Sequence, residues 1–197
     1  LWFADGALGT WRLGFEDAAR DDAAASLRAL ERAGYTVELL SGDRRATARA
    51  LAAELAIAEV TAEASPADKV ARLERLRADG AAVLMVGDGL NDAPALAAAH
   101  ASISPSSAMD VSQTAADAVF QGEKLGAVVD TLTTARAADR LVRQNLALAF
   151  AYNVVTVPIA LAGLVTPLIA AVAMSASSIL VVSNALRLGW QRLDTRT

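Results

Sequence analysis

Apolar residues follow two different patterns along the 197-residue chain. From Leu1 to Arg143, short apolar runs alternate with stretches rich in Ala, Leu and Arg, whereas Gln144 to Leu186 contains no Asp, Glu, Lys or Arg. The first pattern is typical of strands joined by crossover helices, and it predicts an α/β domain with a parallel sheet. The uncharged part predicts membrane helices. Two physically different regions therefore share one chain.

The alternating part predicts individual elements. Short β-rich runs predict strands at 1–4, 10–15, 36–40, 81–86, 101–104 and 118–120. Helices are predicted at 22–33, 44–56 and 66–79, the last with Ser65 as N-cap and Pro66 in its first turn. A helical pattern at 124–143 continues without a strong breaker into the uncharged part. One helix is therefore expected to carry the chain into the membrane.

The uncharged run is about twice the ~20 residues that cross a hydrocarbon core, and residues 163–167 interrupt it. This predicts two spans, 144–164 and 167–187, followed by a cytoplasmic tail at 188–197. Because arginines flank both ends of the run, the positive-inside rule places both ends in the cytoplasm; these are Arg136, Arg140, Arg143, Arg187, Arg192 and Arg196. Two buried core helices of a soluble protein are the alternative.

Charge and composition exclude several functions. Residues 1–143 carry 15 Lys and Arg against 21 Asp and Glu, which argues against a nucleic-acid partner. The chain has no Cys, so it forms no disulfide or thiolate metal site. Its first residues lack the features of a signal peptide, and without an initiator Met the chain is expected to begin within a longer protein.

The segment Met85-Val-Gly-Asp-Gly-Leu-Asn-Asp-Ala-Pro-Ala-Leu96 is the most informative for chemistry. An apolar strand ends there at Asp88, and ligands of parallel sheets collect at such strand ends. A carboxylate oxygen suits Mg²⁺, which takes one or two protein carboxylates together with phosphate oxygens. Gly87 and Gly89 allow the backbone to approach ion and phosphate closely.

Two further segments carry polar groups of the same kind. Ser41, Gly42 and Asp43 follow a predicted strand and could hold a phosphoryl oxygen, and Arg44 continues that loop. Lys69 places a cation in the first turn of a predicted helix. Each feature alone is weak, because a strand-end Asp is often a helix cap and a single Lys is usually a solvated surface charge.

Together, in this order, these segments resemble the haloacid dehalogenase-like phosphotransferases, and the string GDGLNDAPAL resembles their P-type ATPase branch. The resemblance implies a haloacid dehalogenase-like Rossmannoid parallel sheet, present in part: residues 1–122 as the C-terminal part of a phosphorylation domain and 123–143 as a connecting helix. It implies Mg²⁺ and ATP as cofactors. It also implies phosphoryl contacts from Ser41, Gly42 and the adjoining Asp43, charge balance from Lys69, Mg²⁺ binding by Asp88, and support from Asn91 and Asp92, the latter also near the cofactor.

The resemblance is incomplete in one respect. P-type ATPases phosphorylate the Asp of an Asp-Lys-Thr-Gly-Thr motif, which this chain lacks. The nucleophile and the nucleotide-binding domain are therefore expected upstream, and the chain alone is expected to be inactive. Two alternatives remain: a membrane-anchored phosphatase of the same fold, and a non-catalytic, truncated membrane module.

The membrane segment bears on the transported ion. Polar groups within spans usually face protein or a transport path, and a Met thioether suits Cu(I); alone, such residues more often serve helix packing. The pattern of Tyr-Asn followed by Met-x-x-Ser-Ser resembles copper-transporting heavy-metal ATPases, whose zinc and cadmium relatives are expected to carry charges here. The resemblance implies Cu(I) contacts from Tyr152, Asn153, Met174, Ser177 and Ser178.

Residues 101–110 lack the Gly-rich segment of most relatives, and His100 replaces the preceding Asp. This resembles the FixI-type subgroup, associated with copper supply during assembly of haem-copper oxidases. The resemblance implies as partners a lipid membrane, the upstream part of the ATPase and a copper chaperone, and it implies the inner membrane of a bacterium as the location of the parent protein. His100, without a second His or any Cys, is interpreted as a structural or surface residue.

Overall fold

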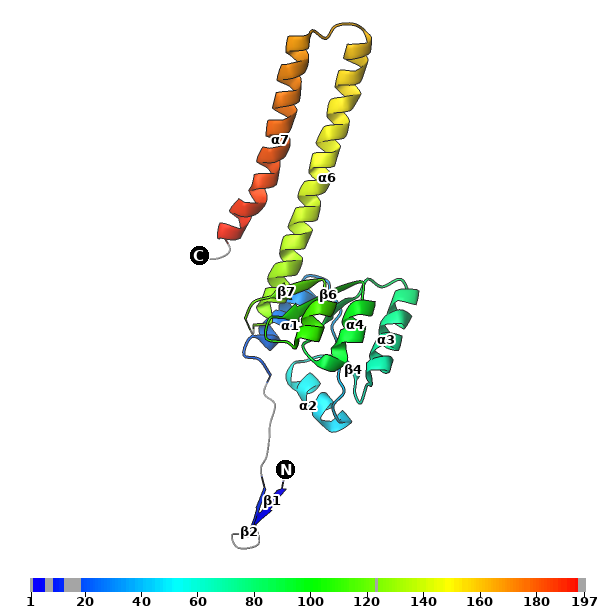
Figure 1. Cartoon of the computed structure of the whole chain (residues 1–197), viewed down its shortest axis with the longest axis vertical. Helices are drawn as coiled ribbons and strands as arrows, with labels where there is room; N and C mark the ends of the chain where they lie inside the picture. The colour runs from blue at the N-terminus through cyan, green and yellow to red at the C-terminus, as the bar shows by residue number, and fades with distance from the viewer. Residues whose placement is uncertain (1, 6–8, 13–18, 123, 195–197) are drawn as a thin grey trace. The chain divides into compact units, whose positions relative to one another are not determined.

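The computed structural model describes residues 2–5, 9–12, 19–122 and 124–194. The chain divides into two compact units, Leu1–Val129 and Asp130–Thr197 (Figure 1). The first unit is an α/β assembly of short strands and helices. The second is a pair of long helices.

Two parallel sheets form the centre of the first unit. β3 (Glu38–Leu40) pairs with β4 (Glu59–Thr61), and β5 (Leu84–Val86), β6 (Ala101–Pro105) and β7 (Ala118–Phe120) form a three-stranded sheet. The predicted parallel arrangement is confirmed, but the described strands form two sheets where one was expected. β4 was not predicted from the sequence, because its three residues are too few to show a period.

A separate hairpin precedes these sheets. β1 (Trp2–Asp5) pairs antiparallel with β2 (Gly9–Arg12). Both strands were predicted, but they do not join the parallel sheets within the described part of the chain. Residues 1 and 13–15, included in the predicted strands, lie outside the described residues.

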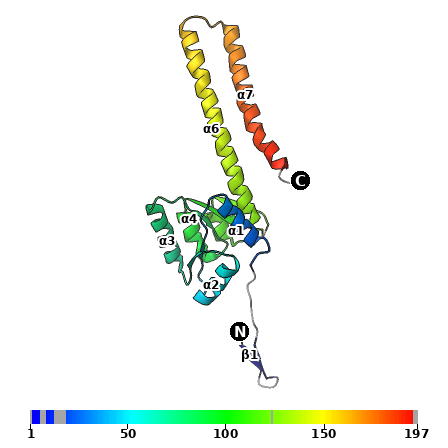
Figure 2. The ribbon, with the colours of Figure 1, turned by 180° about the vertical axis from the view of Figure 1, so that it is seen from behind.

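Three helices of the first unit lie within two residues of their predicted limits: α1 (Ala23–Arg32), α2 (Arg45–Glu54) and α3 (Pro66–Ala78). No limits were predicted for α4 (Ala93–Ala98), for α5 (Asp110–Ala115) or for the 3-10 turn η1 (Leu90–Asp92) before α4. α3 begins with a capping box, in which Ser65 and Asp68 each bind the other's backbone amide. α3 and α4 lie side by side (Figures 1 and 2). Between them lies the apolar cluster of Leu73, Met85, Ala95 and Leu96.

The second unit is a helical hairpin. α6 (Gly126–Leu161) is one continuous helix, as predicted, and α7 (Pro167–Asp194) runs antiparallel beside it (Figures 1 and 2). Gly163 adopts φ +74° between them, a conformation that glycine tolerates best. α7 continues into the stretch that was expected to be a tail.

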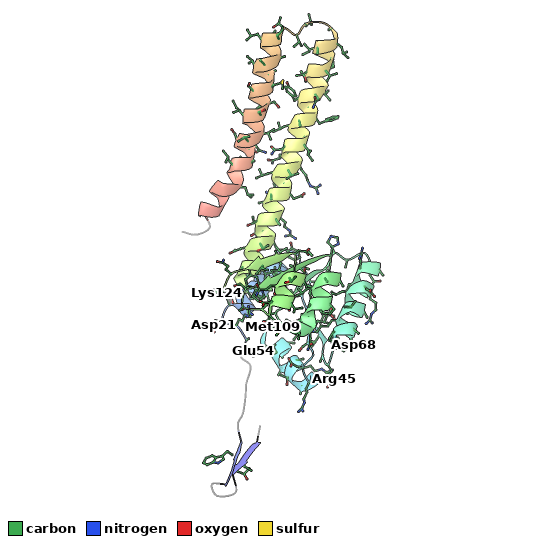
Figure 3. The ribbon with its side chains drawn as sticks, in the orientation of Figure 1. Asp21, Arg45, Glu54, Asp68, Met109 and Lys124 are labelled. Carbon is green, nitrogen blue, oxygen red and sulfur yellow. The ribbon has the colours of Figure 1, made fainter. Side chains whose placement is uncertain are left out.

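Both long helices are apolar enough and long enough to cross a membrane. Side chains project outward from both helices (Figure 3). None of the most apolar window of either helix is buried within the described structure. This argues against two buried core helices among the described residues, since core helices are covered by neighbouring elements.

Candidate functional site

The loop after β5 forms the centre of the candidate phosphoryl site. The Gly89 amide donates to Asp92 Oδ2 at 3.2 Å, and Ser112 Oγ donates to the Gly89 carbonyl at 2.6 Å. A Cβ on Gly87 would lie 2.8 Å from Asp92 Cβ, closer than real Cβ contacts come. The loop can therefore fold tightly around the Asp92 side chain only with glycine at this position.

Lys69 of α3 forms an ion pair with Asp92 of this loop. Lys69 Nζ, from the first turn of α3, lies 2.5 Å from Asp92 Oδ1, and both side chains are largely buried. Asp92 thus binds a cation through one oxygen and a backbone amide through the other. Two residues that the sequence predicted separately are brought together, with the ammonium group held in a fixed position.

Asp88 lies beside this pair, at the end of β5, with its side chain 60% exposed. Its Oδ2 accepts a hydrogen bond from the Arg20 guanidinium at 3.2 Å, a contact that the sequence analysis missed. An accessible carboxylate flanked by glycines fits a hard divalent cation. The described residues contain no group of three or more His, Cys, Asp or Glu that could hold a metal.

The Ser41 loop follows β3. Ser41 Oγ donates to Asp43 Oδ2 at 2.8 Å and accepts from the Asp43 amide at 3.0 Å. Backbone bonds from Ser41 to Thr61 and from Ala64 to Ser41 join this loop to the segment after β4. Gly42 is exposed, and within the described residues no hydrogen bond joins this loop to Lys69 or Asp92. Asn91 is exposed in η1.

Polar contacts of α3 hold together the elements that carry the candidate site residues. The Arg72 guanidinium binds both carboxylate oxygens of Glu38 at 3.0–3.2 Å, and this raises the pKa of Arg72. Thr61 Oγ1 donates to the same carboxylate at 3.0 Å. Hydrogen bonds from Ser65 lower the pKa of Asp68, which Figure 3 labels. Arg72 thus joins the helix that carries Lys69 to the strand that leads to Ser41.

The five predicted metal-path residues divide into two groups. Tyr152 and Ser177 are half-buried, whereas Asn153, Met174 and Ser178 are exposed, with Met174 67% exposed. Met174 and Ser178 are one turn apart on α7 and so share a face. Asn153 Nδ2 donates to the Ala149 carbonyl at 2.9 Å. The hairpin alone therefore does not gather all five side chains around one point.

Comparisons with known proteins agree with this geometry. Residues 10–100 match the family model of the haloacid dehalogenase-like hydrolases. The chain is 56% identical over 177 residues to the nitrogen fixation protein FixI of Bradyrhizobium diazoefficiens, covering 90% of this chain and 24% of that protein. It is 45% identical over 172 residues to a copper-exporting P-type ATPase of Mycobacterium leprae, covering 87% of this chain and 22% of that protein.

A solved structure extends the likeness to both units. A zinc-transporting PIB-type ATPase superposes with a TM-score of 0.80 at 36% identity, over 88% of this chain and 28% of that one. The fold and site thus define a haloacid dehalogenase-like parallel α/β portion followed by two long apolar helices. The chain is homologous to the C-terminal portion of the P1B-type heavy-metal ATPases, with FixI proteins among its relatives. It spans about a quarter of the length of these curated relatives.

Proposed function

We propose that this chain forms the C-terminal part of the phosphorylation domain and two membrane spans of an ATP-driven Cu(I) exporter. The observation that carries the proposal is the buried Lys69–Asp92 pair in the glycine loop beside Asp88. A fixed ammonium group next to an accessible carboxylate matches the needs of phosphoryl transfer, where positioning and charge stabilisation supply most of the catalysis.

Each residue has a defined task in this proposal. Lys69, oriented by Asp92, offsets negative charge on the phosphoryl group. Ser41 and the amides next to Gly42 and Asp43 hold a phosphoryl oxygen, and Asn91 supports the loop that carries Asp92. Asp88 would hold Mg²⁺, with Asp92 nearby. When bound, the ion neutralises charge on the phosphoryl oxygens.

The phosphorylated Asp is proposed to come from a segment outside this chain, because the Asp-Lys-Thr-Gly-Thr motif is absent. The two described sheets support this idea. β3 and β5 are each paired on one side within the described residues, and each leads into a candidate phosphoryl loop. A further parallel strand between these two edges would end at both loops.

Cu(I) is the proposed cargo for two reasons. The run from Gln144 to Leu186 has no charged side chain, and Met174 supplies a soft thioether ligand. We propose Tyr152, Asn153 and Ser178 as further contacts and Ser177 as an adjoining one. Similarity to a protein described as a copper-exporting P-type ATPase also supports copper as the cargo. We further propose a role in copper supply for haem-copper oxidases, with a copper chaperone as a partner.

The same proposal places the chain in the inner or plasma membrane of a bacterium. Arginines flank both ends of the uncharged run, which puts the α/β unit and the C-terminus in the cytoplasm. The turn around Gly163 then faces outward.

A phosphorylation assay on an ATPase that contains this chain tests the proposal. With ATP, Mg²⁺ and Cu(I), Asp88→Asn is expected to abolish the phosphoenzyme. Met174→Ala with Ser178→Ala is expected to reduce Cu(I)-dependent phosphorylation from ATP while phosphorylation from inorganic phosphate persists, because only the metal path is changed.

Met109→Ala is the matched control, since Met109 is an exposed Met outside the spans. Normal phosphorylation of the Asp88 variant would remove Asp88 from the site. Phosphorylation that is stimulated by Zn²⁺ but not by Cu(I) would mean that the cargo is zinc and not copper. Copper-independent turnover of phosphate esters without ATP would favour the membrane-anchored phosphatase.

A further inference from the structure

Amide side chains join α6 to α7 at a distance from the residues proposed to bind metal. Asn184 Nδ2 donates to Asn145 Oδ1 at 2.9 Å and, more weakly, to Gln144 Oε1 at 3.4 Å. These partners are 39 and 40 residues apart in sequence, so the bonds fix the helices relative to each other. Hydrogen bonds between apolar helices resist sliding because a separated amide in a bilayer has few other partners.

Both ends of the Asn184 amide are engaged. Its Oδ1 accepts from the Arg187 guanidinium at 3.2 Å while its Nδ2 binds across the hairpin. The arginine therefore orients the amide with its donor toward α6. An open groove, lined in part by Ala147 and Leu148, lies beside this cluster. The hydrogen bonds therefore join the helices where the hairpin is open on one side.

Burial defines a seam between the two helices. From Leu141 onward, the buried or half-buried positions recur every three or four residues, as expected of two packed helices. Many of them are small, which allows close approach. We call these positions the hairpin seam; they are Leu141, Asn145, Ala149, Tyr152 and Thr156 of α6, and Ala170, Ala173, Ser177, Val181, Asn184 and Leu188 of α7.

The seam relates the amide pair to the proposed metal path. Tyr152 lies seven residues beyond Asn145 on α6, and Ser177 lies seven residues before Asn184 on antiparallel α7. Two turns of helix correspond to about 10 Å in each case. When Asn145 and Asn184 are paired, Tyr152 and Ser177 therefore lie at the same level. The levels of Met174 and Ser178 along the hairpin are then fixed as well, because both lie on the same helix as Ser177.

The geometry points to Asn145 and Asn184 as a positioning clamp that sets the register of the metal-path residues on α6 and α7. A slip of one helix by a single turn moves it by about 5.4 Å and breaks the Asn145–Asn184 bond. Neither residue is among those proposed to bind the ion. The effect on transport rests on the proposed function, whereas the effect on register does not.

Disulfide formation measures the register directly. The chain contains no Cys, so Tyr152→Cys with Ser177→Cys introduces a single reactive pair. In membranes, with a mild oxidant, this pair is expected to cross-link. Asn184→Ala or Asn145→Ala is expected to slow cross-linking by about three- to tenfold, and the double Ala variant no further. Asn145→Asp keeps the acceptor and should retain the rate.

Ser183→Ala is the matched control, because Ser183 is an exposed polar neighbour of Asn184. Equal cross-linking rates in all variants, or fully additive losses in the double variant, would overturn the clamp. This readout involves no copper and no ATP, so it stands apart from the proposed function.

Copper activation measures the consequence. In an ATPase containing this chain, Asn184→Ala is expected to raise the half-activating Cu(I) concentration about three- to tenfold, with phosphorylation from inorganic phosphate unchanged. Slowed cross-linking with unchanged copper activation would overturn the positioning role. If copper does not stimulate the ATPase with Asn145 and Asn184 intact, but cross-linking of the Cys pair still depends on these amides, the proposed function is wrong and the clamp stands.

Discussion

At the scale of single residues, the candidate site depends on the space around Asp92. Its carboxylate binds Lys69 Nζ and the Gly89 amide, and its Cβ lies where a side chain on Gly87 would be. The atom nearest to that added Cβ is the Asp92 Cβ, which is bonded directly to the backbone and so cannot swing aside. The loop and the ion pair therefore depend on each other.

Gly87→Ala is expected to destabilise the α/β unit by about 1–3 kcal/mol, because an overpacked site must shift the loop or Asp92. For a unit of this size, that lowers the unfolding midpoint by roughly 5–15 °C, measured by calorimetry of the chain in detergent. Gly42→Ala is the matched control: its added Cβ would lie 3.5 Å from the Ala64 carbonyl oxygen, an ordinary contact. Equal midpoints for the two variants would contradict the packing argument.

The sequence predicted candidate site residues but not their contacts. Asp88, Lys69 and Asp92 were proposed from strand ends and from the family resemblance, and the structure places Lys69 against Asp92, a pairing that was not predicted. The Arg20–Asp88 and Arg72–Glu38 contacts were missed. Each joins residues far apart in sequence, and a pairing of this kind depends on tertiary packing that no local pattern records.

At the scale of elements, Asp22 links the start of α1 to the start of α6. Its carboxylate accepts from the Gly126 amide at 2.7 Å and from the Leu125 amide at 3.1 Å. It therefore caps a helix about one hundred residues away, where amides would otherwise lack partners. The Gly126 bond is the main reason that the pKa of Asp22 lies below its ordinary value of 3.8, despite opposing desolvation.

Asp22→Ala is expected to lower the hydrogen-exchange protection of the Leu125 and Gly126 amides about fivefold, equivalent to about 1 kcal/mol for a lost cap. Asp21→Ala is the matched control, since Asp21 is an exposed neighbouring carboxylate (Figure 3). Because the folded pKa is lowered, the cap is fully present above pH 3.8 and is lost as pH falls through the folded value. Protection that falls equally with pH in the Ala variant would refute this assignment.

Helices were predicted more accurately than strands for physical reasons. α3 has a cap, a proline and an apolar face, and its predicted limits differ from the observed ones by one residue. β4 has three residues and no turn signal that separates it from its surroundings. The pairing of strands into two sheets was not predictable, because it depends on which neighbouring strands are present.

At the scale of the whole molecule, the division into an α/β unit and a helical hairpin was visible in the charge pattern alone. A run of 43 uncharged residues has a single break, and the structure places the turn between α6 and α7 there. The register of the hairpin was not visible, because it depends on Asn145 and Asn184, which by themselves resemble other polar residues in the run.

The proposed topology can be tested on the chain itself, because it has no Cys. Leu164, 69% exposed in the hairpin turn, and Ala135, exposed on α6 before the uncharged run, provide one label site for each side. In intact cells a membrane-impermeant maleimide is expected to modify Leu164→Cys but not Ala135→Cys, since flanking arginines stay on the cytoplasmic side. Permeabilised cells should show modification of both, which controls for accessibility. Labelling of Ala135→Cys in intact cells would mean an inverted hairpin, and protection of both would mean that the turn does not reach the outer surface.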